Sequence, residues 1–196
     1  MPTPQKRVEF NRDLVIERAT ELFWREGYDG VSIGNLVDAT GLNRYALYQA
    51  FGGKRDIFIA VLDAYLERAK ASISAALAVP GISPYDALYN CIFEKMLRPE
   101  MFPAGCLMCT TCVDVASGDP EIAERVGQCT EELNVLFAHA FRDAQAEGRA
   151  PGVRDPSAFA ELASALYFST GVQARMGRSR DDLVSALRKT LDSLKH

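Results

Sequence analysis

The stretch from Val31 to Phe58, VSIGNLVDATGLNRYALYQAFGGKRDIF, constrains this chain more than any other part of its sequence. It holds two short helical patterns, a glycine turn between them and the start of a third helix. Ser32 is a residue type that caps a helix by accepting a hydrogen bond from a free backbone N–H. The apolar spacing after it stops at Gly41, which supplies a positive φ without strain. The pattern predicts a helix-turn-helix.

The second helix of this pair presents a polar face suited to DNA. Asn43 is expected to cap it, Leu47 and Phe51 fall on its inner side, and Ala46 is small enough to let the two helices approach. A cation, two phenol hydroxyls and an amide remain outside, and such groups read base edges and hold phosphates. These outward residues are Arg44, Tyr45, Tyr48 and Gln49.

Positive charge is concentrated beside this helix. The run Gly52 to Arg55, GGKR, combines two glycines with two basic residues at a predicted helix start, where backbone N–H groups can hold a phosphate. Between Ala39 and Arg55 there are three basic residues and no acidic one, although the whole chain has a net charge of -4. A local excess of positive charge is what DNA contact requires.

The stretch from Leu14 to Phe58 resembles the DNA-binding domain of the TetR/AcrR family of bacterial transcriptional regulators. The resemblance lies in a first helix ending LFWREGY, followed by VSIGNLVDATGLN, ALYQAF and GGKRDIF. It implies that Tyr48 and Lys54 meet DNA phosphates and that Asn43, Arg44, Tyr45 and Gln49 face the major groove. The family's commonest pattern at the start of the recognition helix is Ser-Lys-Gly-Thr, and this chain departs from it.

The resemblance and the residue pattern together give a predicted DNA-contacting set. Its members are Ser32, Asn43, Arg44, Tyr45, Tyr48, Gln49 and Lys54. Near the amino end, Lys6 and Arg7 belong either to a solvated tail or to an arm that reaches the minor groove or an adjacent phosphate. The expected DNA partner is a double-stranded palindromic operator.

Composition and periodicity predict an all-α protein of two parts. A chain of 196 residues with 48% hydrophobic residues can form a proper core, and helical spacing recurs without an alternating strand pattern. We expect a helix-turn-helix domain over residues 1–56 and a helical effector-binding and dimerisation domain over residues 57–196. Further helices are predicted over 54–77 and 85–97, from Asp119 to Gly148, and after caps at Ser157 and Ser179.

Several function classes find no support in the sequence. No run of 18 apolar residues and no apolar leader is present, so we expect a cytoplasmic protein without a membrane partner. Five cysteines, an odd number, agree with a reducing compartment. We find no Ser/His/Asp order, no phosphate loop after a strand and no metal-ligand motif, so neither an enzyme nor a cofactor is expected. A pure interaction module is the remaining alternative to a regulator.

Three cysteines stand out in the stretch Gly105 to Ala116, GCLMCTTCVDVA. Cys106, Cys109 and Cys112 occur at steps of three residues, which places each about 60° around a helix from the last. They either line a packed helix or pocket wall, or act as a thiol sensor, or bind a soft metal ion. Cys106 is the best sensor candidate because it lies near a predicted helix start, whose dipole favours the thiolate.

The second part is expected to bind a hydrophobic small-molecule effector among the apolar and sulfur-bearing residues of its middle helices. The same residues would also serve as plain core. The pocket candidates are Phe93, Met96, Phe102, Met108, Cys109, Phe137, Phe141 and Tyr167. Because the helix over 54–77 belongs to both parts, an effector could change DNA affinity through it.

The last two amphipathic helices carry small residues that permit close approach of a second copy. The resemblance implies that they form a four-helix bundle with their mate in a homodimer, and the alternative is that they complete the core of one subunit. The predicted interface residues are Leu166, Val172, Leu183, Leu187 and Leu191. A dimer would place two recognition helices about one DNA turn apart, roughly 34 to 36 Å.

Overall fold

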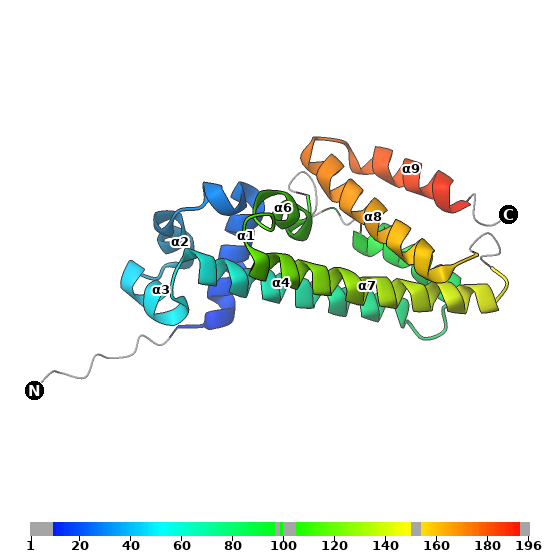
Figure 1. The fold of residues 1–196 in the computed structure, drawn as a ribbon, viewed down its shortest axis with the longest axis horizontal. Coiled ribbons are helices and arrows are strands. Elements are labelled where there is room, and N and C mark those ends of the chain that lie inside the picture. Colours follow the sequence, from blue (N-terminus) through cyan, green and yellow to red (C-terminus); the bar gives the residue numbers. More distant parts are fainter. Residues whose placement is uncertain (1–9, 97–98, 100–104, 150–153, 193–196) are drawn as a thin grey trace, which may run out of the picture. The chain divides into compact units, whose positions relative to one another are not determined.

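A computed structural model describes residues 10–96, 99, 105–149 and 154–192, except for the side chains of residues 94–96 and 190–192. Within these residues the chain is helical and has no strand, which confirms the all-α prediction (Figure 1). The helices are α1 Arg12–Gly30, α2 Ile33–Thr40, α3 Arg44–Phe51, α4 Lys54–Leu77, α5 Pro84–Asn90, the π-helix η1 Cys91–Met96, α6 Leu107–Asp114, α7 Pro120–Ala146, α8 Pro156–Arg175 and α9 Arg180–Asp192. In the part of the chain that is described, none of these helices has both the length and the apolar character needed to cross a membrane.

The chain divides into two compact units, residues 1–65 and residues 66–196. This division falls inside α4, nine residues after the boundary expected from the sequence. Helix α4 is continuous over 24 residues, so one helix supplies the end of unit 1 and the start of unit 2.

Unit 1 is organised around an aromatic core. Phe23 of α1 and Phe58 of α4 are at most 1% exposed, and their rings meet edge to face with centroids 5.0 Å apart. Asn11 caps α1 by accepting a hydrogen bond from the Leu14 N–H at 3.1 Å. Gly27 interrupts the helix with φ 72° and ψ 172°, a backbone conformation that glycine adopts without steric cost. Gly27 therefore breaks the helix, which continues for one further turn as far as Gly30.

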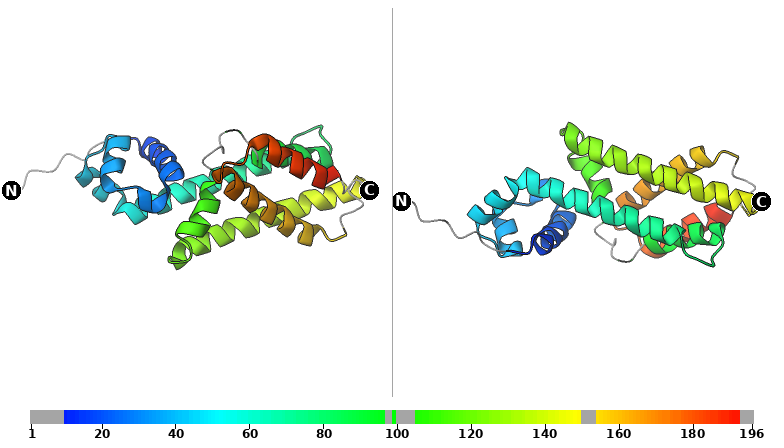
Figure 2. Two further views of the ribbon diagram at one scale, coloured as in Figure 1. Left: turned by 90° about the horizontal axis from the view of Figure 1, so that it is seen from above. Right: turned by 90° about the horizontal axis from the view of Figure 1, so that it is seen from below.

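Helices α2 and α3 form the predicted helix-turn-helix and lie next to each other in both figures of the fold (Figures 1 and 2). Gly41 ends α2 with φ 74°, as the turn requires. Asn43 caps α3 by accepting a hydrogen bond from the Ala46 N–H at 2.8 Å. Leu36 of α2 and Leu47 of α3 are fully buried and join the pair to the core.

Unit 2 is built on the long helix α7, which packs against α5 and α8, while α6 contacts both α7 and α8 (Figure 2). Asp119 caps α7 and Pro120 occupies its first position, so the helix begins where it was expected. The buried face of α7 repeats at helical spacing along its length and includes Ile122, Val126, Cys129, Leu133, Phe137, Phe141 and Ala144.

Two predicted helix boundaries are wrong. The expected single helix over 85–97 is α5 followed by the π-helical segment Cys91–Met96, whose wider turn leaves no mark in apolar spacing. The cap of α8 is Asp155 instead of Ser157, because Asp155 Oδ1 accepts hydrogen bonds from the Ser157 and Ala158 N–H groups at 2.9 and 3.3 Å. Pro156 then stands at the first position of the helix, where its missing N–H costs nothing.

Helices α6 and α8 approach each other through glycines. A Cβ atom on Gly171 would lie 2.9 Å from the Cys109 sulfur and 3.1 Å from the Cys106 Cβ. A Cβ atom on Gly105, whose φ is 79°, would lie 2.7 Å from the Gly171 carbonyl oxygen. A larger residue at either glycine would therefore force neighbouring atoms to shift.

We therefore expect Gly171→Ala to lower the free energy of unfolding by about 1 to 2 kcal/mol, because overpacking outweighs the gain in helix propensity. Gly127→Ala is the matched control, since a Cβ at that helical position in α7 meets nothing within 4 Å. It should raise the free energy of unfolding by about 0.5 to 1 kcal/mol. Urea denaturation at one protein concentration measures both, and equal effects of the two changes would contradict the close packing of α6 on α8.

Candidate nucleic-acid interface

Helix α3 presents a polar outer face over a buried inner face. Ala46 and Leu47 are buried, whereas Tyr45 is 57% and Tyr48 44% exposed. Arg44 and Gln49 are exposed as well. Two tyrosines that are this exposed are not core residues. With the guanidinium of Arg44 and the amide of Gln49 they form a surface that can stack on other groups and can donate and accept hydrogen bonds.

Two residues of the predicted set also maintain the local fold. Ser32 forms a capping box with Asn35, in which the Asn35 N–H donates to the Ser32 hydroxyl at 3.1 Å and the Ser32 N–H donates to Asn35 Oδ1 at 2.9 Å. The side-chain oxygen of Asn43 is occupied by its own cap hydrogen bond. Both side chains are exposed, so each combines a capping role with a position at the surface.

The turn between α3 and α4 holds the predicted phosphate site. Gly52 has φ 105°, and a Cβ atom there would lie 2.6 Å from a carboxylate oxygen of Asp56, so a side chain does not fit. Lys54 begins α4, and its ammonium lies 4.3 Å from the centroid of the Tyr28 ring. Arg55 is half-buried beside it. The basic run of the sequence is thus placed directly after the exposed face of α3.

The cysteine cluster is buried in unit 2. Cys106 is the N-cap of α6, is 1% exposed, and has its sulfur 3.4 Å from the Tyr167 hydroxyl. Cys109 is 3% exposed. A hydrogen bond with the Cys106 thiol, followed by burial, raises the pKa of Cys109 far above its usual range, and burial also raises the pKa of Cys112. Among the described residues, no group of three metal-ligating side chains is placed to hold a metal ion.

Burial raises the pKa of Cys129 on α7 from 9.0 to about 11. Because the thiolate is the reactive form and Cys129 is only 3% exposed, we expect iodoacetamide at pH 8 to alkylate it in the folded protein at least about a hundred-fold more slowly than in the denatured chain. Peptide mass mapping over time measures both rates. Equal rates in the folded and the denatured chain would contradict the burial of this thiol.

The predicted pocket residues lie largely inside unit 2. Buried among them are Phe93, Met108, Cys109, Phe137, Phe141 and Tyr167, while Phe102 and the side chain of Met96 lie outside the described residues. Cys109 also lines a cavity of about 210 Å³ between α6 and α8, with Val113, Gly171 and Met176 among its walls. Of the described pocket candidates, Cys109 therefore lines this cavity, and the others named here are buried in the core of unit 2.

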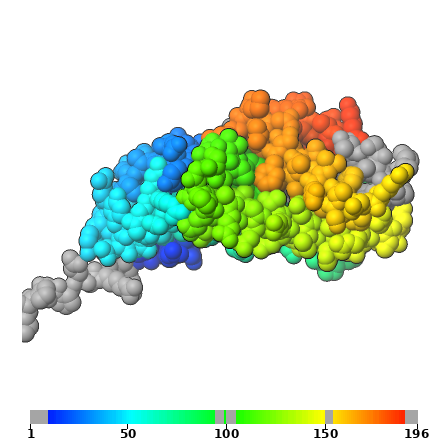
Figure 3. Space-filling view, viewed as in Figure 1, coloured from blue at the N-terminus to red at the C-terminus, as the bar shows by residue number. Residues whose placement is uncertain are grey.

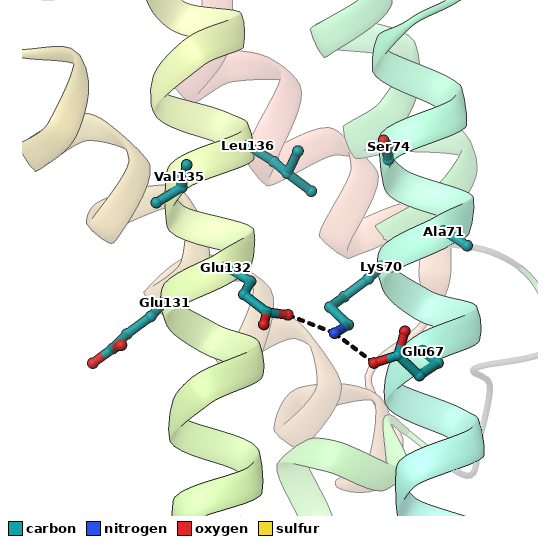
Figure 4. A pocket seen from close by; sticks show the side chains of 8 residues that line it. All are labelled: Glu67, Lys70, Ala71, Ser74, Glu131, Glu132, Val135 and Leu136. Carbon is teal, nitrogen blue, oxygen red and sulfur yellow. Dashed lines mark hydrogen bonds and ion pairs between the residues drawn. The ribbon is translucent and has the colours of Figure 1, made fainter.

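A second hollow lies between α4 and α7 (Figure 4). The ammonium of Lys70 bridges the two helices, with Nζ 2.5 Å from a carboxylate oxygen of Glu132 and 2.6 Å from one of Glu67. These hydrogen bonds raise the pKa of Lys70 above its usual range, so the ammonium stays charged. Leu136 and Ala71 supply apolar walls. A ligand that parted the two helices here would break this ion pair.

The predicted interface residues differ in exposure. On α8, Val172 is 42% exposed and Leu166 is half-buried, whereas on α9 Leu187 is half-buried and Leu183 is 2% exposed. The side chain of Leu191 lies outside the described residues, as do Lys6 and Arg7. Leu162 on α8 and Met176, the residue that follows this helix, are 49% and 80% exposed and add apolar surface towards its two ends. Figure 3 shows α8 and α9 at the surface of unit 2.

Some features of the sites were missed by sequence reasoning. The contact of Tyr28 with Lys54 joins residues 26 positions apart, and the bridge from Lys70 to Glu132 joins residues 62 positions apart. Neither pairing has a local signal in the sequence. The motif LFWREGY did mark Tyr28 as part of a recurring pattern, but not as a partner of a basic residue.

Comparisons with known proteins agree with this geometry. Residues 15–61 match the family model described as bacterial regulatory proteins, tetR family, and residues 86–190 match that of the tetracyclin repressor-like C-terminal domain. The HTH-type transcriptional repressor ComR of Escherichia coli (strain K12) is 30% identical over 93% of this chain and 88% of its own length. The uncharacterized HTH-type transcriptional regulator YezE of Bacillus subtilis (strain 168) is 31% identical over 88% of this chain and 92% of its own.

A solved structure of a TetR family regulator is also similar to this chain. It holds a cysteine mutant of the TetR family transcriptional regulator CifR in complex with 26-base-pair operator DNA. Its chain is 25% identical to this one, with a TM-score of 0.79 over 96% of this chain and 99% of its own. Both units of the described structure therefore have counterparts in a single known protein.

Proposed function

The chain is a transcriptional regulator that belongs to the TetR family, and we propose that it is a homodimeric DNA-binding repressor which a small-molecule effector releases from a palindromic operator. The observation that carries the proposal is the exposed face of α3, where Arg44, Tyr45 and Tyr48 stand outside while the opposite side of the helix is buried. The relatives support it, since ComR is a repressor and CifR binds operator DNA.

In the proposed complex α3 lies in the major groove. Arg44 and Gln49 carry the groups that pair with guanine and adenine edges, while Tyr48 and Lys54 contact phosphates. Two copies joined through α8 and α9 would place their α3 helices about 34 to 36 Å apart, one turn of DNA. Leu162 and Val172 on α8, together with Met176 just after it, support this choice of interface because these apolar side chains are exposed in the single chain.

The effector is proposed to bind unit 2 and to act through α4. A ligand shifts the equilibrium only if it binds one arrangement of the helices better than the other. The hollow between α4 and α7 is bridged by the ion pair of Lys70 with Glu132, so a ligand that separates them would move the helix that continues into unit 1. DNA affinity would then fall in proportion to the differential binding.

A thiol-based or metal-based sensor is less well supported. The nucleophilic form of a cysteine is the thiolate, and the pKa values of Cys109, Cys112 and Cys129 are all raised. Among the described residues, Cys106, Cys109 and Cys112 do not form a group that could hold a metal ion. An effector recognised by shape and apolar contact agrees better with these surroundings.

Selection of bound fragments from the source genome with the purified full chain tests the proposal. We expect enrichment of a palindromic site whose half-sites are one DNA turn apart, and the neighbouring genes would narrow the chemistry of the effector. Recovery of fragments without a shared motif would contradict the role of α3 as a sequence reader.

A further inference from the structure

We infer that Tyr28 is a positioning residue for DNA binding, because its ring holds the Lys54 ammonium where an operator phosphate would meet the start of α4. The inference rests on the proposed function and adds to it a residue outside the helix-turn-helix. The ammonium lies 4.3 Å from the ring centroid, well inside the distance of about 6 Å at which a cation is attracted to an aromatic face.

The ring that receives this ammonium is fixed by the core. Tyr28 meets Phe58 edge to face with centroids 4.9 Å apart and stacks on Phe23 with centroids 6.2 Å apart. Both phenylalanines are at most 1% exposed. Gly27 turns the chain just before Tyr28 with its non-helical φ and ψ, so the ring follows a fixed bend and not a loose loop. Tyr28 therefore offers a rigid surface to a flexible side chain.

A neutral ring holds a lysine without neutralising it. A lysine stem has several rotatable bonds, and ordering it on contact with DNA costs conformational entropy. The face of the Tyr28 ring limits the freedom of the lysine stem before DNA binds. Some of the three N–H donors of the ammonium are still able to bond phosphate oxygens. Lys70 shows the opposite arrangement, since it is held by the carboxylates of Glu67 and Glu132 and its charge is compensated.

The test is a double-mutant cycle on operator affinity, measured by fluorescence anisotropy with the full chain. Tyr28→Leu keeps an apolar side chain but removes the ring, and we expect it to weaken binding about two- to five-fold per half-site, because the lysine stem must then be ordered when DNA binds. In a Lys54→Met background the same change should have no further effect. Tyr28→Phe is the matched control and should bind as the unmodified protein does.

An isosteric series keeps the test valid if Tyr28→Leu does not fold. Phenylalanine with increasing ring fluorination at position 28 keeps the shape and progressively weakens the negative face of the ring. We expect operator affinity to fall with each added fluorine, and to stay constant along the same series in the Lys54→Met background. A flat series with Lys54 present, or equal losses in both backgrounds, would give Tyr28 a purely structural role and overturn the inference.

Different results would contradict the positioning role of Tyr28 and the DNA-binding function of the chain. If Arg44→Ala weakens operator binding while the Tyr28 and Lys54 variants bind normally, the positioning role is wrong and the regulator remains. If the unmodified chain binds no DNA fragment in preference to any other, the proposed function itself is wrong.

Discussion

Arg44→Ala is expected to lower operator affinity by about 1 to 3 kcal/mol per half-site, roughly 5- to 150-fold, and to relax sequence preference at one base pair of each half-site. The reason is the position of Arg44 in the first turn of α3, where it is exposed while Ala46 and Leu47 on the inner side are buried. Helix N-terminal residues of a recognition helix reach base edges, and the planar guanidinium can pair with a guanine through two hydrogen bonds.

Arg25→Ala is the matched control for this prediction. It removes the same charge from the surface of unit 1, but Arg25 lies on α1, where it pairs with Glu21 at 2.8 Å. We expect less than a two-fold change in operator affinity for Arg25→Ala and an unchanged sedimentation mass for both variants. Equal losses from the two substitutions would mean that only the net charge matters and that α3 does not read bases.

Val172→Glu is expected to convert the dimer to a monomer and so to lower operator affinity by a factor of about 10² to 10⁴, the usual gain from bivalent attachment. The side chain is 42% exposed in the single chain, so the change should leave the subunit folded. In a two-fold symmetric interface the new carboxylate would occur twice and lose its water without a partner, which costs several kcal/mol.

The control for this second prediction is Val135→Glu on α7. Val135 is 57% exposed, so the substitution adds the same charge at a similarly accessible valine outside the proposed interface. Sedimentation equilibrium should give one chain for Val172→Glu and two chains for Val135→Glu. A mass of two chains for both variants would place the interface elsewhere. Leu187→Glu on α9 should act like Val172→Glu, although its half-buried position adds a cost to the subunit itself.

The helix-turn-helix could be predicted from the sequence because its signals are local. Ser32, Gly41 and Asn43 each act on backbone groups within four residues, and the structure confirms all three. The polar outer face of α3 followed from the same helical spacing. The first residue of a helix is harder to predict where two residues could cap it, as Asp155 and Ser157 could at the start of α8.

The features of unit 2 that matter for an effector could not be predicted in the same way. Helical spacing alone did not distinguish the short π-helical segment after Asn90 from a continued α-helix. The close contact of Gly171 with Cys109 and the bridge from Lys70 to Glu132 both depend on which helices meet in space. Sequence spacing places residues on a face of one helix and says nothing of the opposite helix.

The most direct test of the central claim is a salt titration of the full chain on the selected operator and on a scrambled duplex of the same length. If the exposed face of α3 and the basic start of α4 bind DNA, the operator should be preferred by at least about 10³ at physiological salt. The logarithm of its binding constant should then fall with that of the salt concentration with a slope of about -3 to -5. Equal affinity for the two duplexes, with a slope near zero, would contradict the claim.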